Sequence, residues 1–148
     1  MKLSAFLVFA LIISLLSFSA SNNIISNNEE YVHFNQVTMK FQGTDAVISM
    51  SYSLDMFSSM YVFLMGTYNL EPAIDTFFYD FGDVEVLEIG KDSAVIFVKD
   101  VSRKNDEYYL HDSHEMGGTV KVLTMIYPDG STRTVSSVTA TPDTFYDG

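Results

Sequence analysis

The stretch Ala46-Val47-Ile48-Ser49-Met50-Ser51-Tyr52-Ser53-Leu54 places an apolar residue at every second position. A period of two residues is typical of a β-strand with one buried and one solvated face. The preceding segment, Val32–Phe41, alternates in the same way over its last residues, and Gln42–Asp45 between the two segments has the composition of a turn. The sequence therefore predicts a β-hairpin with one wet face.

The apolar period becomes helical after this hairpin. Phe57, Met60, Tyr61, Leu64 and Met65 follow the spacing i, i+3, i+4, i+7 and i+8, which predicts a helix that ends at Gly66 and buries these five side chains. The alternative is a buried strand over residues 60–65, because tyrosine, valine and phenylalanine favour sheet. The apolar spacing covers two full turns, so we favour the helix.

A second helix is predicted to begin at Asn69, a residue type that caps helix N-termini, with Glu71 and Pro72 in its first turn. Gly82 is expected to end this helix. Its buried side is expected to consist of four apolar residues, Ile74, Phe77, Phe78 and Phe81.

Sheet patterns return downstream of this helix. Four further strands are predicted, at Val84–Ile89, Ala94–Val98, Val120–Tyr127 and Thr132–Thr139, and residues 100–118 are expected to form a long, polar, irregular connection. Hairpins around a central helical pair imply an α+β domain. We expect a mostly antiparallel sheet of about six strands with two helices packed on one face.

The first twenty residues have the layout of a secretory signal peptide. Lys2 supplies a positive charge, residues 3–16 are predominantly apolar, and residues 17–21 offer small side chains for cleavage. The same segment, Leu3–Ala20, is a membrane anchor if it is not cleaved. Residues 21–30 (SNNIISNNEE) read as a flexible polar spacer, and residues 31–148 as a single domain.

The composition narrows the classes of function. The net charge is −11, and loss of Lys2 with the leader takes it to −12, so the chain repels phosphate backbones and no nucleic-acid partner is expected. There is no cysteine, which excludes disulfides and thiolate metal sites. An exported domain without disulfides suggests a prokaryotic source.

Residues 108–115 (YYLHDSHE) hold the main cluster of chemically active side chains. His111 and His114 lie three residues apart, a spacing at which two imidazoles can meet on one side of a helical turn. Asp112 or Glu115 supplies a carboxylate that could complete a shell for zinc, nickel or copper. The spacing does not match the helical zincin motif. Loop histidines that hydrogen-bond to the backbone or face water are commoner than loop histidines that bind a metal. We therefore expect no cofactor, and the alternative is a divalent transition metal at this cluster.

Tyr108 and Tyr109 lie in the same polar segment. An exposed tyrosine pair can stack on sugar rings or anchor a protein partner, whereas a loop packed onto the sheet would bury it. We therefore expect an exported, non-enzymatic interaction module that binds a protein or glycan through residues 100–118. Its expected location is extracellular, or the outer face of the cytoplasmic membrane through Leu3–Ala20. The alternative is a metal-dependent binder or hydrolase that uses His111 and His114.

Overall fold

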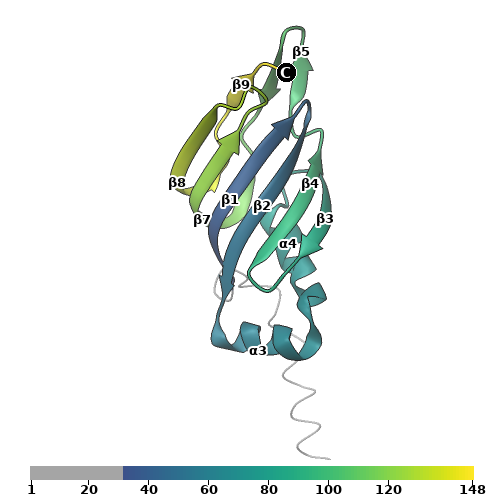
Figure 1. Ribbon diagram of the computed structural model, residues 1–148, viewed down its shortest axis with the longest axis vertical. Helices are drawn as coiled ribbons and strands as arrows, with labels where there is room; N and C mark the ends of the chain where they lie inside the picture. Colours follow the sequence, from purple (N-terminus) through teal and green to yellow (C-terminus); the bar gives the residue numbers. More distant parts are fainter. Residues whose placement is uncertain (1–31) are drawn as a thin grey trace, which may run out of the picture.

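The structure, a computed structural model, describes residues 32–148 (Figure 1). The expected leader and spacer lie outside the described residues. A six-stranded sheet has the order β3-β4-β2-β1-β7-β8, and a three-stranded sheet has the order β5-β6-β9. The strands are β1 Val32–Gln42, β2 Asp45–Leu54, β3 Asp83–Ile89, β4 Ser93–Lys99, β5 Arg103–Asn105, β6 Tyr108–His111, β7 Glu115–Ile126, β8 Thr132–Ala140 and β9 Thr144–Tyr146. The predicted α+β class and the order of strands and helices are confirmed.

The β1–β2 hairpin forms as its alternation predicts. The register pairs Gln42 with Asp45 across a tight turn, in which Gly43 adopts a φ of 65°. The apolar members of β2 point into the core, and the serines on its opposite face are exposed or half-buried. Every neighbouring pair of strands is antiparallel except β1 and β7, which run parallel. The sheet is therefore mixed but mostly antiparallel.

Helix α4 (Glu71–Phe77) covers one face of the large sheet. The four side chains predicted for its buried side are all buried, and Phe77 stacks on Phe34 of β1 with ring centroids 3.8 Å apart. The helix ends at Phe77, and Gly82 instead occupies the turn into β3. Gly117 of β7 lies against α4 so closely that a Cβ there would stand 2.7 Å from the carbonyl oxygen of Thr76.

The cap predicted for α4 was wrong. Asn69 belongs to a short 3-10 turn, η1 (Thr67–Leu70), and Leu70 takes the N-cap position. The Asn69 amide donates hydrogen bonds to the carbonyl oxygens of Met65 and Gly66, at 3.2 and 3.4 Å. Asn69 therefore satisfies the C-terminal end of the preceding helix rather than starting the next one.

Helix α3 (Met56–Met65) begins where the carboxylate of Asp55 accepts a hydrogen bond from the Ser58 amide at 2.7 Å, and it ends at Gly66. The buried face predicted for it was wrong. Met60, Tyr61, Leu64 and Met65 are exposed, whereas Val62 is buried. Phe57, the fifth residue of the predicted face, lies outside the described side chains. The physical reason is placement, since α3 crosses the lower end of the sheet instead of packing along its face (Figure 1).

The irregular connection predicted at residues 100–118 was also wrong. Its residues form β5, β6 and the first part of β7. β6 pairs with β9, so that Tyr109 lies opposite Tyr146 near the C-terminus. This small sheet caps the end of the molecule that lies opposite α3 (Figure 1).

Candidate functional site

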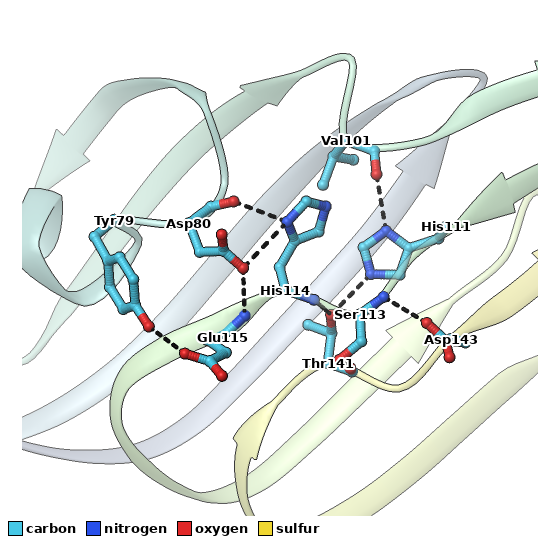
Figure 2. Close-up of polar contacts among 9 residues, drawn as sticks. All are labelled: Tyr79, Asp80, Val101, His111, Ser113, His114, Glu115, Thr141 and Asp143. Carbon is cyan, nitrogen blue, oxygen red and sulfur yellow. Dashed lines mark hydrogen bonds and ion pairs between the residues drawn. The ribbon is translucent and has the colours of Figure 1, made fainter.

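The two histidines of the predicted cluster do come together. His111 ends β6, His114 precedes β7, and their ring centroids lie 5.3 Å apart (Figure 2). They are held by extended backbone and not by a helical turn. His111 is fully buried and packs edge-on against Phe41, at 5.1 Å between ring centroids.

Both ring nitrogens of His111 have hydrogen-bond partners. Nδ1 lies 2.9 Å from the carbonyl oxygen of Val101, which can only accept, so this nitrogen carries the proton. Nε2 lies 2.9 Å from Oγ1 of Thr141 and accepts from that hydroxyl. The hydroxyl oxygen accepts in turn from the backbone N–H of His114, at 2.9 Å. Burial lowers the pKa of His111 below its usual value, in agreement with a neutral ring.

The carboxylates of the predicted cluster point elsewhere. Figure 2 shows Glu115 directed toward Tyr79, whose hydroxyl donates to it at 2.5 Å. This hydrogen bond raises the pKa of Tyr79. Asp112 pairs with Arg103 at 3.2 Å on the exposed surface. Neither carboxylate therefore completes a shell with the two imidazoles.

His114 and Glu115 instead hold the segment that follows α4. Nδ1 of His114 lies 2.8 Å from the carbonyl oxygen of Asp80, and the Glu115 N–H donates to the Asp80 carboxylate at 2.8 Å. Among residues 32–148, no group of three or more His, Asp or Glu side chains is arranged to hold a metal ion. The Ser113 N–H donates to the Asp143 carboxylate at 2.6 Å, and its hydroxyl donates to the Thr141 carbonyl oxygen. The arrangement is that of a polar clamp, defined as His111, Ser113, His114, Thr141 and Asp80, between the two sheets and the α4–β3 connection.

The two tyrosines of the predicted binding pair have different environments. Tyr109 is half-buried and stacks on Tyr146, with centroids 5.5 Å apart and planes at 14°. Tyr108 is 37% exposed, and its ring meets the 74% exposed ring of Phe145 edge-on at 6.3 Å. The exposed aromatic pair is therefore Tyr108 with Phe145, which we call the aromatic tip. Phe145 was missed because β9 had not been predicted.

A larger apolar surface lies at the opposite end of the molecule. We call it the α3–η1 surface, and its exposed side chains are Met56, Met60, Tyr61, Phe63, Leu64, Met65 and Tyr68. Phe63 and Tyr68 are each 77% exposed. Residues 56–70 contain no charged side chain, although 18% of the chain is charged. The charge-free run was the signal in the sequence that could have marked this surface.

A shallow pocket of about 250 Å³ is open between the start of β1 and β7. Its lining combines two apolar side chains with polar ones, and Lys121 at its edge donates to Asn35 at 2.7 Å.

No described helix is long and apolar enough to cross a bilayer. Comparison with protein-family models, with curated proteins and with solved structures gives no significant match for this chain.

Proposed function

We propose that this protein is an exported, non-enzymatic interaction module that makes contact through its α3–η1 surface. Export is supported by the basic start and apolar run of residues 1–16, and the acidic composition suits a solvated extracytoplasmic domain. The observation that carries the proposal is the cluster of large exposed apolar side chains on α3 and η1.

A contiguous apolar surface is energetically unfavourable when a monomer leaves it exposed to water. Scattered apolar residues are normal on soluble proteins, but contiguous apolar patches mark contacts with proteins, membranes or ligands. Here the exposed residues follow one another along a single helix and the turn after it, from Met56 to Tyr68. These exposed side chains support α3–η1 as the main contact surface, ahead of residues 100–118, where the sequence pattern had suggested it.

The predicted cluster at residues 108–115 serves this function indirectly. Its polar groups satisfy one another and hold the small sheet to the large one, so the two ends of the molecule are fixed relative to each other. This role needs no substrate and no metal.

The test is cysteine accessibility in cells that produce the protein. The described chain has no free cysteine, and the full sequence contains none, so Phe63→Cys and Ser136→Cys give two matched single-cysteine variants. Ser136 is exposed on β8, the edge strand of the large sheet. A membrane-impermeant maleimide should label Ser136→Cys on intact cells and Phe63→Cys only after the cells are dissolved in detergent.

Two outcomes would contradict the proposal. Equal labelling of both variants on intact cells would show that the α3–η1 surface contacts nothing. Labelling of neither variant until the cells are lysed would show that the protein is not exported.

A second candidate contact is the aromatic tip. Tyr108 and Phe145 present two adjacent exposed rings, with their centroids 6.3 Å apart. Exposed aromatic rings stack on sugar faces and anchor protein partners. We therefore propose the aromatic tip as the second candidate site for the protein or glycan partner that the sequence suggested.

A further inference from the structure

We propose that the α3–η1 surface is the membrane-facing end of the protein and that its apolar side chains insert into the interface of a bilayer with neutral headgroups. The inference rests on the proposed function and names the partner of that surface. Three features of the molecule point to a bilayer: the chemistry of the surface, its orientation, and the place at which β1 begins.

The chemistry of the surface matches a lipid interface. Methionine, leucine and phenylalanine supply the apolar contact, and Tyr61 and Tyr68 add rings that are amphipathic and suit the level of the headgroups. Residues 56–70 carry no charge that insertion would have to desolvate. Asp55 and Glu71 flank the run, and the chain is acidic as a whole, so anionic headgroups would repel it.

The orientation of α3 allows a flat contact. The helix lies across the end of the long axis of the molecule, with the sheet extending away from it (Figure 1). Val62 points inward and is buried, which anchors the helix to the domain. A plane that touches the outer side of α3 therefore meets this helix before it meets the strands.

The start of β1 lies at the same end. Val32 pairs with Leu54, which comes just before the Asp55 cap of α3. The apolar run Leu3–Leu16 is joined to this point by residues 17–31, which span at most about 50 Å when fully extended. A bilayer that holds Leu3–Leu16 is therefore within reach of α3.

A second copy of the chain fits this surface less well. A symmetric dimer would bring the same patch of both copies together. Each copy would then bring its Asp55 and Glu71 to the rim of the contact, and like charges at a rim repel. A bilayer with neutral headgroups does not repel these two carboxylates.

The experiment uses the full chain in vesicles of phosphatidylcholine, with a nitroxide spin label on Phe63→Cys or on Ser136→Cys. We expect the label at position 63 to lose access to a water-soluble nickel chelate and to gain access to oxygen when vesicles are present. The label at position 136 should remain accessible to the chelate. Because each label reports only its own position, insertion of Leu3–Leu16 alone does not produce the expected result.

A variant series checks that the side chains of α3 are responsible. Met60→Ser with Leu64→Ser should return the label at position 63 to water, whereas Leu87→Ser, which changes an exposed leucine on β3, should not. All three positions are exposed, so the thermal unfolding midpoint should stay unchanged and report intact folding.

The outcomes separate the two proposals. Free access of the chelate to position 63 in vesicles, together with protection of Phe63→Cys on cells, would overturn the bilayer as partner and leave a protein partner in its place. Dipolar broadening at position 63 that persists at low protein density would indicate a second copy and would also overturn it. Free access both in vesicles and on cells would overturn the contact function itself.

Discussion

The Thr141 hydroxyl joins two histidines that belong to different parts of the fold. It lies 2.9 Å from Nε2 of His111, thirty residues earlier in the chain, and 2.9 Å from the backbone nitrogen of His114. One buried hydroxyl therefore both donates and accepts, and it ties β6 and the start of β7 to the segment between β8 and β9.

Removal of the Thr141 hydroxyl should lower the stability of the fold. Thr141→Val keeps the shape of the side chain but leaves Nε2 of His111 and the His114 N–H without partners, and we expect a loss of about 1–3 kcal/mol in the free energy of unfolding. Ser102→Ala is the matched control, because the buried Ser102 hydroxyl has no hydrogen-bond partner within residues 32–148. Urea denaturation measures both. Equal stability of the two variants would show that the clamp contributes little.

The buried His111 should make stability fall in mild acid. Burial lowers its pKa below the usual 6.5, so the unfolded chain binds a proton that the folded chain does not. The contribution of the neutral ring is complete above about pH 6.5 and is lost as the pH falls from there toward the lowered folded pKa. NMR titration of the His111 ring protons checks the direction against the usual value of 6.5. A His111 pKa above 6.5 would contradict it.

Gly117 is expected to tolerate no side chain. A Cβ would lie 2.7 Å from the Thr76 carbonyl oxygen and 3.1 Å from the Phe77 Cα, and both atoms belong to the backbone of α4. Gly117→Ala must therefore push α4 away from β7, at a cost of about 1–3 kcal/mol typical of overpacking. Thermal denaturation measures the effect. Thr119→Ala, an exposed change on the same strand, should leave the midpoint nearly unchanged.

The adjacent tyrosines should respond differently to truncation. Tyr109→Ala removes a ring stacked on Tyr146 and should lower stability by a few kcal/mol, about 3 at most for a half-buried ring. Tyr108→Ala removes an exposed ring and should change stability by less than about 0.5 kcal/mol.

If the aromatic tip binds glycan or protein, Tyr108→Ala with Phe145→Ala should abolish that binding in a glycan array or pull-down with no loss of fold. Binding that survives the double change would remove the tip from consideration.

Metal binding by the histidines stays a prediction that thermal unfolding can decide. Nε2 of His111 already accepts from Thr141, so a metal would have to displace this hydrogen bond. We expect Zn²⁺, Ni²⁺ and Cu²⁺ to leave the midpoint unchanged, whereas a true ligand at 100 times its Kd stabilises by about 2.7 kcal/mol. A rise with one metal that disappears in His114→Ala would support the metal-dependent alternative.

Part of the site was within reach of sequence reasoning. The spacing of His111 and His114 suggested that their rings could meet on a helical turn. The rings do lie 5.3 Å apart, but at the ends of two strands and not on a helix. Thr141 was missed because a threonine in a polar C-terminal stretch has no pattern that marks it as buried. The directions of Asp112 and Glu115 were equally hidden, because Arg103 and Tyr79 come from other elements.

The sequence by itself determined the local conformations. The alternation of residues 46–54 specifies a strand, and the apolar spacing of residues 57–65 between Asp55 and Gly66 specifies a helix, because periodicity and caps act over a few neighbouring residues. Only the tertiary structure decided which surfaces are buried and which distant segments pair. The apolar side of α3 faces outward because the sheet ends where the helix crosses it. β6 becomes the central strand of the small sheet because β9, from the far end of the chain, pairs with its free edge opposite β5. Such pairings depend on residues that no local pattern connects.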